Sequence, residues 1–118
     1  MTTAKIEKHN DINSLRSIKL TSGYTDSNGI VWSTDSQSVT DLNITVGLIA
    51  TGAISGNLTW RDDLNINHTM TSQNIVQLAG GMALTGQQIY AASWSHKANV
   101  DVLTSVSSIS SYDITTGW

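Results

Sequence analysis

The sequence predicts an α+β fold in which small β-hairpins pack on two helices, the second of them long. An Asn28-Gly29 pair lies between two β-prone runs, and apolar residues recur at spacings of three and four from Val39 to Ala53 and again from Ile75 to Val100. A chain of 118 residues is long enough for a single modest core. We expect an N-terminal arm over residues 1–13 and a single domain over residues 14–118.

The arm is predicted because residues 1–13 are polar and show no usable periodicity. They are expected to be flexible or to lie on a neighbouring molecule. The hairpin that follows is predicted from Asn28-Gly29, because this pair tolerates the positive φ values of a tight turn. Its buried face is expected to be formed by Ile18, Leu20, Ile30 and Trp32.

The first helix is expected to begin near Thr34. Thr34 and Gln37 have the spacing of a capping box, and Asp35 is favourable at the N-terminal end of the helix dipole. Gly52 and Gly56 can end the helix. Its apolar face is predicted to be Val39, Leu42, Val46, Ile49 and Ala53.

A second pair of extended runs is predicted in the segment GNLTWRDDLNINHTM, residues 56–70. The polar residues from Asp62 to Asn65 form its turn, since Asp and Asn side chains bond to nearby backbone amides. Arg61 is expected to contact one of the adjacent carboxylates. This stretch also concentrates charge in a charge-poor chain.

The long helix is predicted over about residues 72–103, or roughly 45 Å. Thr71 can be its N-cap with Asn74 at the third position, and Met70 and Ile75 occupy the hydrophobic-staple positions. No Asp, Glu, Lys or Arg occurs between Asp63 and Lys97. The interior glycines cost about 1 kcal/mol each relative to alanine, so the helix needs close packing, or else breaks at Gly80-Gly81.

Composition excludes several classes of function. The formal net charge of -3 provides no basic face for nucleic acid, and no apolar run is long enough to insert into a membrane. The absence of cysteine excludes disulfides and thiolate metal sites. The N-terminus lacks the apolar region of a signal peptide, so synthesis and folding in a cytoplasm are expected.

No catalytic or metal-binding pattern is found. Asp62 and Asp63 are adjacent, so their side chains point to opposite faces of an extended chain, and Arg61 would hold either carboxylate ionised. The three histidines, His9, His68 and His96, are too widely spaced in sequence for a recognisable ligand motif. We therefore predict a protein that is not an enzyme and that has no metal and no cofactor.

The order of motifs resembles a small uncharacterised domain of bacteriophage tail-fibre and tail-associated proteins. The likeness covers about residues 16–118 and is carried by TWRDDLNINHTMTSQNIVQLAGGM, IYAASWSHKANVDVL and the ending ITTGW. It implies a virion component and carries over no catalytic residue. The structural positions that it marks are Trp60, Asp63, Tyr90, Ser93, Trp94, Lys97 and Trp118.

The resemblance implies a structural protein of the virion tail, in the baseplate or fibre region, made in the host cytoplasm. Its partners would be other phage tail proteins and copies of itself, and both a trimer and a hexamer fit the way tails are built. The candidate structural or interface residues are Trp32, Trp60, Asp63, Met82, Gly86, Tyr90, Ser93, Trp94, Lys97 and Trp118.

Two other functions stay open. A tail-fibre assembly chaperone would share the resemblance but be absent from the finished particle. A module that binds host-surface glycans would present exposed aromatic side chains, and Trp32 or Trp60 lying exposed in a cleft would favour it.

Overall fold

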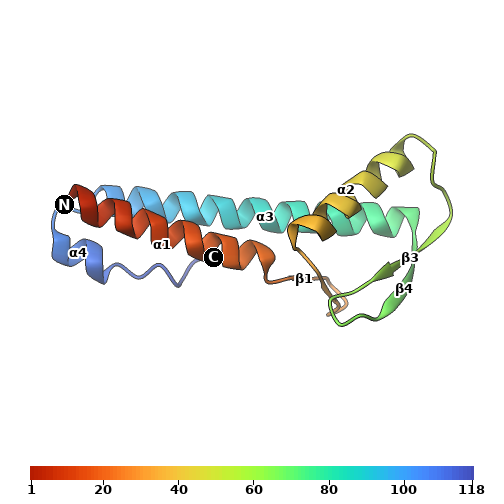
Figure 1. The fold of residues 1–118 in the computed structure, drawn as a ribbon, viewed down its shortest axis with the longest axis horizontal. Helices are drawn as coiled ribbons and strands as arrows, with labels where there is room; N and C mark the ends of the chain where they lie inside the picture. Colours follow the sequence, from red (N-terminus) through yellow and green to blue (C-terminus); the bar gives the residue numbers. More distant parts are fainter. The chain divides into compact units, whose positions relative to one another are not determined.

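A computed structural model describes residues 1–118 and contains four helices and two small antiparallel sheets (Figure 1). The elements in chain order are α1 (Thr2–Thr21), β1 (Tyr24–Thr25), β2 (Val31–Trp32), α2 (Ser36–Ala50), β3 (Asn57–Arg61), β4 (Asn67–Thr71), α3 (Ser72–Asp101) and α4 (Val106–Ser111). The predicted α+β class, with hairpins packed on helices, is therefore confirmed.

The chain forms two compact units. One comprises residues 1–19 and 86–118, and the other comprises residues 20–85. Helix α3 contributes its first part to the second of these units and its last part to the first. Each unit has a core of its own.

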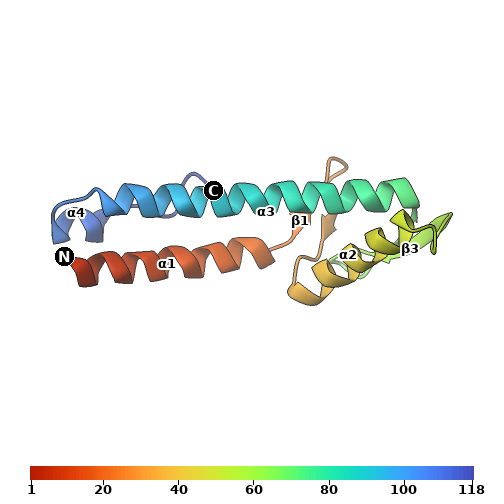
Figure 2. The same ribbon diagram turned by 90° about the horizontal axis from the view of Figure 1, so that it is seen from above.

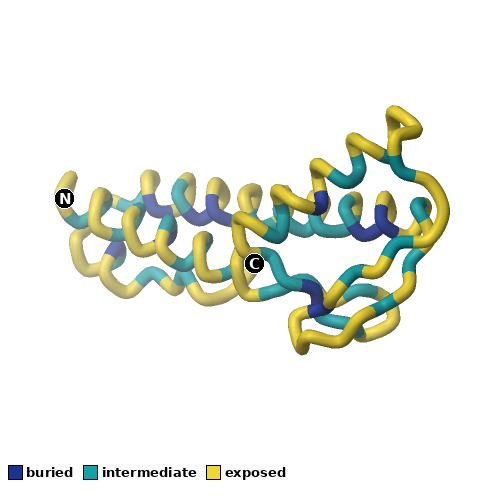
Figure 3. The backbone as a smooth tube through the Cα atoms, turned by 45° about the vertical axis from the view of Figure 1, so that its right-hand side comes forward, coloured by how far each residue is buried: buried dark blue, intermediate teal, exposed yellow.

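The unit formed by residues 20–85 holds both hairpins. In the first, Tyr24 pairs with Trp32, and in the second, Trp60 pairs with His68. Helix α2 and the first part of α3 cover the hairpins. Figure 3 shows the buried positions as short stretches among exposed ones, and those of this core are Trp32, Leu42, Ile75 and Leu78.

This unit is built from two successive copies of the same β-hairpin–helix arrangement. In each copy, two short strands are followed by a helix. The helix begins at Ser36, four residues after Trp32, in the first copy, and at Ser72, four residues after His68, in the second. Identical residues recur at a constant offset of 36 positions: Asp26 and Asp62, Ile30 and Ile66, Ser36-Gln37 and Ser72-Gln73, Leu42 and Leu78. The sequence repeat and the structural repeat therefore coincide.

The helix starts confirm one predicted cap and correct the other. Thr71 Oγ1 accepts a hydrogen bond from Asn74 N, which confirms the predicted cap, and Asn74 Oδ1 in turn accepts one from Thr71 N. The cap of α2 is Asp35 rather than Thr34, since the Asp35 carboxylate accepts from Ser38 N. Asp35 occupies the same position in the first copy as Thr71 does in the second.

The residues predicted to form an N-terminal arm belong to α1, and so do Ile18 and Leu20, which were expected in a strand. The apolar periodicity is hidden because cations occupy inward positions. Lys5 Nζ donates to the backbone oxygen of Asp101 at 2.6 Å, and Lys8 Nζ donates to that of Ser110 at 3.2 Å. Helix α1 thus satisfies carbonyls at the C-terminal ends of α3 and α4.

The core of this other unit is formed by Ile12, Val100 and Ile109, and α1 runs alongside the last part of α3 (Figure 2). The C-terminal segment is held by a buried histidine on α3. His96 Nε2–H donates to the Thr116 carbonyl at 2.7 Å, so in the neutral ring Nδ1 accepts from the Tyr112 hydroxyl at 2.8 Å. Trp118 packs on this core and donates its indole N–H to the Ile114 carbonyl.

Candidate functional site

Asp26 organises the turn of the first hairpin. Its Oδ1 accepts hydrogen bonds from the backbone N–H groups of Asn28 at 2.8 Å and Ile30 at 3.0 Å, and its Oδ2 accepts from the Trp32 indole at 2.9 Å. Asp26 N donates to the Ile30 carbonyl, so the loop has three residues. Gly29 takes a φ of 81°, which places the positive φ at the last residue of the loop.

Asp62 organises the second turn in the same way. Its Oδ1 accepts from Leu64 N at 2.8 Å and Ile66 N at 3.0 Å, and its Oδ2 accepts from His68 Nε2–H at 2.7 Å. Asn65 takes the positive φ, at 63°. The expected contact between Arg61 and an aspartate is wrong, because the Arg61 Nε–H donates to Asn67 Oδ1.

These hydrogen bonds hold both carboxylates ionised. The hydrogen bond from His68 is the largest cause that places the pKa of Asp62 below its usual range, and the backbone N–H groups add to it. Burial acts to raise the pKa of Asp26, but the hydrogen bonds from Trp32, Ile30 and Asn28 outweigh it and lower the pKa. Negative charge is therefore present at both turns.

Trp32 and His68 occupy equivalent positions in the two copies, and their rings meet with centroids 5.1 Å apart. On one side of this contact the second turn closes on the first hairpin, since Asp63 N donates to the Val31 carbonyl at 2.9 Å. In the two copies, Ser27 is equivalent to Asp63 and Asn67 is equivalent to Val31. The equivalent hydrogen bond, from Ser27 N to the Asn67 carbonyl, is absent. The two copies thus differ in whether the turn of one is bonded to the strand of the other.

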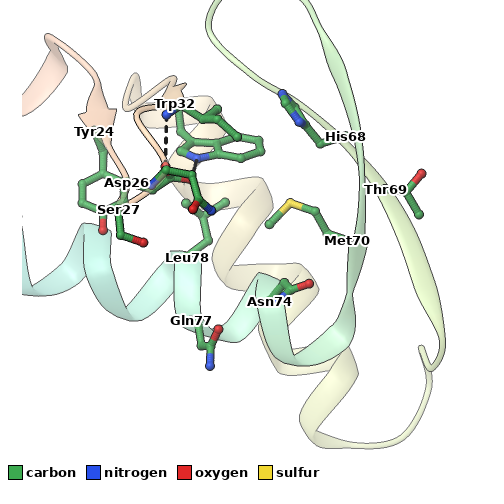
Figure 4. A pocket seen from close by; sticks show the side chains of 12 residues that line it. Tyr24, Asp26, Ser27, Trp32, His68, Thr69, Met70, Asn74, Gln77 and Leu78 are labelled. Atoms are coloured by element: carbon green, nitrogen blue, oxygen red, sulfur yellow. Dashed lines mark hydrogen bonds between the residues drawn. The ribbon is translucent and has the colours of Figure 1, made fainter.

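A pocket of about 340 Å³ opens on the side where this hydrogen bond between the first turn and β4 is absent (Figure 4). It lies between the first turn, strand β4 and the start of α3, within the unit of residues 20–85. The side chain of Thr69 points away from it, so this residue lines the pocket with its backbone. The lining residues are Tyr24, Asp26, Ser27, Asn28, Ile30, Trp32, His68, Thr69, Met70, Asn74, Gln77 and Leu78.

The pocket combines an apolar floor with neutral hydrogen-bonding groups and one carboxylate. Asn28, Asn74 and Gln77 supply amides, Asp26 supplies the carboxylate, and no lysine or arginine lines it. A ligand with a phosphate, sulfate or carboxylate group would find no lysine or arginine here, and the one basic ring, His68, is bonded to Asp62. The lining therefore favours a neutral or positively charged ligand.

The Asp62–His68 pair has the form of an acid–base pair, and it fixes the orientation of the His68 ring. The buried Asp62 carboxylate orients the imidazole against Trp32, and no hydroxyl donates to or accepts from the remaining ring nitrogen. No group of three or more His, Asp or Glu side chains is arranged to hold a metal ion. None of the helices combines the length and hydropathy of a bilayer-spanning segment.

The structure distributes the candidate residues over both units. Trp32 is buried and lines the pocket, Trp60 and Met82 pack on the core around it, and Asp63 makes the backbone bond to Val31. The candidates in the other unit are Gly86, Tyr90, Ser93, Trp94, Lys97 and Trp118.

In that other unit, Tyr90 and Trp94 form an exposed aromatic pair on α3. Their ring centroids lie 6.1 Å apart, and the Arg16 guanidinium lies 5.0 Å from the centre of the Tyr90 ring. Ser93 lies between them in sequence, but its side chain is fully buried and donates a hydrogen bond to the Tyr90 carbonyl.

The sequence analysis did not identify Asp26 or His68 as functional candidates. They belong to two equivalent hydrogen-bonded pairs, Asp26–Trp32 and Asp62–His68. The signal that would have found them is the repeat, because Asp26-x-x-Gly-Ile-x-Trp and Asp62-x-x-Asn-Ile-x-His align without a gap. Only two of these seven positions are identical, so the repeat is faint until the turns are compared in three dimensions.

A sequence-family model described as a domain of unknown function (DUF4376) matches residues 3–116. No curated protein and no solved structure matches the chain.

Proposed function

The chain belongs to the DUF4376 family of domains of unknown function, and we propose that it is a structural protein of a bacteriophage tail, in the baseplate or fibre region. It acts by packing against copies of itself and neighbouring tail proteins. The assignment to a tail rests on the resemblance of residues 16–118 to tail-associated domains. The packing role rests on the surface of α3.

Helix α3 carries a second apolar face in addition to the one that it buries. The exposed residues of this face recur at spacings of three and four, with one adjacent pair at Ala83 and Leu84, and none is charged. We call this face the α3 stripe; it carries Val76, Gly80, Ala83 and Leu84 in the unit of residues 20–85, and Gln87, Ala91, Trp94 and Ala98 in the other unit.

A helix on the surface of a monomer usually presents charged residues to water, whereas the α3 stripe presents mainly small and apolar side chains. The small residues allow another helix to approach closely. Trp94 is 57% exposed and Tyr90 is 40% exposed, and aromatic residues of this kind are common anchors of protein interfaces. This uncharged, unburied stripe is the observation that carries the packing role.

The test is the oligomeric state of the purified chain by light scattering, with Ala83→Arg and Gln88→Arg as a matched pair. Both residues are exposed, but Gln88 lies about 140° further round the helix and outside the stripe. The wild type and Gln88→Arg are expected to be trimeric or hexameric, and Ala83→Arg is expected to dissociate. A monomeric wild type would contradict the packing role.

Mass spectrometry of purified virions separates the structural role from the assembly chaperone, since only the structural protein stays in the particle. A glycan-binding role receives less support from the tryptophans. Trp32 is only 2% exposed, and Trp60 is half-buried against the core, so neither offers the exposed platform that such a role requires.

A further inference from the structure

Strand β4 has a free edge beside the pocket. Because Asp62 N donates to the Ile66 carbonyl, and bonded pairs alternate along an antiparallel ladder, the backbone groups of Asn67 and Thr69 point away from β3. The first hairpin supports this reading. There the same rule makes Val31 point outward, and its carbonyl does bond outward, to Asp63 N.

The equivalent edge of the first hairpin shows what such an edge accepts. The Val31 carbonyl takes a backbone N–H from the second turn, which covers that edge within the unit. The matching Asn67 carbonyl has no backbone donor, and Thr69 exposes its backbone to the pocket. One of two equivalent edges is thus filled by polypeptide, and the other is open.

We propose that the open edge of β4 is a docking site for an extended segment of a partner polypeptide that is neutral or basic. The segment pairs with Asn67 and Thr69 as an added strand, in the way that other exposed edges bind peptides. Because side chains alternate along a strand, one of its side chains enters the pocket over Met70 and Leu78.

The charge of the groups around the open edge of β4 favours a neutral or basic peptide segment over an acidic one. The Asp26 carboxylate lines the pocket, Asp62 and Asp63 lie in the other turn, and the lining contains no lysine or arginine. A lysine or arginine side chain that enters the pocket meets Asp26 and the ring of Tyr24. An acidic side chain would meet the Asp26 carboxylate with no lysine or arginine to offset it, so acidic segments are disfavoured.

This proposal does not depend on the assignment to a phage tail, and its surface is distinct from the α3 stripe. Ala83→Arg is therefore expected to leave peptide binding unchanged while it disrupts self-association. Loss of one property without the other distinguishes the failure of this inference from the failure of the packing role.

The test selects a random 12-residue peptide library on the full-length chain and measures the affinity of the enriched peptides. Thr69→Pro removes the outward N–H of β4, and Thr59→Pro makes the same change on its cross-strand neighbour at the outer edge of β3. Thr69→Pro is expected to weaken binding at least about tenfold and Thr59→Pro to leave it within about twofold. Replacing a peptide Lys or Arg by Glu is expected to weaken binding by a similar factor.

A measurement on the wild type completes the test, because a proline variant that fails to fold would say nothing about docking. The enriched peptide is expected to slow hydrogen exchange at the Thr69 amide and not at the Thr59 amide. The inference is overturned if no peptide is enriched, if Thr59→Pro weakens binding as much as Thr69→Pro, or if Thr69 exchange is unchanged.

Discussion

At the scale of single residues, two aspartates order the two hairpins with the same set of hydrogen bonds. Asp26 and Asp62 each accept two backbone N–H groups of their own turn and one ring N–H from the following strand. Each carboxylate thereby links its turn to the aromatic contact at the centre of the unit. These hydrogen bonds favour the ionised form of both carboxylates.

These carboxylates predict a loss of stability in acid. The pKa values of Asp26 and Asp62 lie below the ordinary value, and hydrogen bonds from Ser33 and Ser38 lower the pKa of Asp35 to about 2. A lowered folded-state pKa contributes stability that is present above the unfolded pKa of about 4 and is lost as the pH falls through the folded value. The urea midpoint is expected to fall between about pH 4 and pH 2.

The variant Asp62→Asn tests the contribution of one of these groups. It is expected to lower the urea midpoint at pH 7 and to reduce the fall between about pH 4 and pH 2, because it removes one carboxylate whose pKa is lowered on folding. A pH profile parallel to that of the wild type would contradict the role given to this carboxylate.

The adjacent glycines of α3 are predicted to respond to alanine with opposite signs. A Cβ on Gly81 would overlap the Tyr24 hydroxyl, whereas a Cβ on Gly80 would meet nothing within 4 Å. Gly80→Ala is expected to stabilise the helix by about 0.5–1 kcal/mol, since it removes the cost of glycine in a helix interior. Gly81→Ala is expected to destabilise the protein by about 1–2 kcal/mol, because a half-buried tyrosine must move.

The measurement is the free energy of unfolding of the two variants from urea titration. Equal effects of the two substitutions would show that Tyr24 does not pack on Gly81 as described. The contact also explains why the helix tolerates this glycine pair without a break.

At the scale of elements, the two hairpins solve the same problem with different residues. Each has a three-residue loop whose last residue takes a positive φ, and this residue is Gly29 in one loop and Asn65 in the other. Asparagine is one of the few residues with a side chain that enters this region readily. The faint sequence repeat is therefore maintained by backbone geometry more than by residue identity.

This equivalence gives a prediction for the turns. Gly29→Ala is expected to destabilise the protein by about 1–2 kcal/mol, because in the left-handed region the Cβ of alanine lies too close to the following carbonyl oxygen. Asn65→Gly is expected to change stability by less than about 0.5 kcal/mol, since glycine enters that region freely. Unfolding in urea measures both, and a strongly destabilised Asn65→Gly variant would contradict the equivalence.

At the scale of the whole molecule, residues from both ends of the chain share one core. Ile12 of α1 packs with Val100 of α3 and Ile109 of α4, and Trp118 lies against the same cluster. The cluster joins residues that are far apart in sequence, so it exists only in the folded chain. Helix α1 is consequently a part of the fold.

The role of α1 in the core is tested by Ile12→Ala, with Ile6→Ala as the matched control on the same helix. Ile12 is 0% exposed and Ile6 is 57% exposed. Ile12→Ala is expected to cost about 2–4 kcal/mol, and Ile6→Ala less than about 0.5 kcal/mol, as for surface substitutions. Similar free energies of unfolding for the two variants would show that α1 is dispensable.

Local signals predicted those parts of the fold that local interactions form. The cap and staple around Thr71 and the apolar spacing after Ile75 predicted the long helix, and its observed bounds are Ser72–Asp101. The Asn28-Gly29 pair predicted the first hairpin, although the structure places the positive φ at Gly29 alone. Asp35 replaced Thr34 as a cap because several neighbouring polar residues could each serve, and only the final backbone selects one.

The sequence by itself determined the class of fold, the hairpins and the two helices that bear apolar faces, because capping, turn geometry and periodicity act over a few residues. Only the tertiary structure decided that residues 2–21 are helical, since Lys5, Lys8 and His9 share the inward side of α1 with Ile12 and their partners lie at the far end of the chain. It also decided that Asp62 faces His68 rather than Arg61, and that one of two equivalent strand edges is open. The helical N-terminus and the open strand edge depend on contacts between distant segments, whereas the Asp62–His68 pair depends on the backbone geometry of the second hairpin.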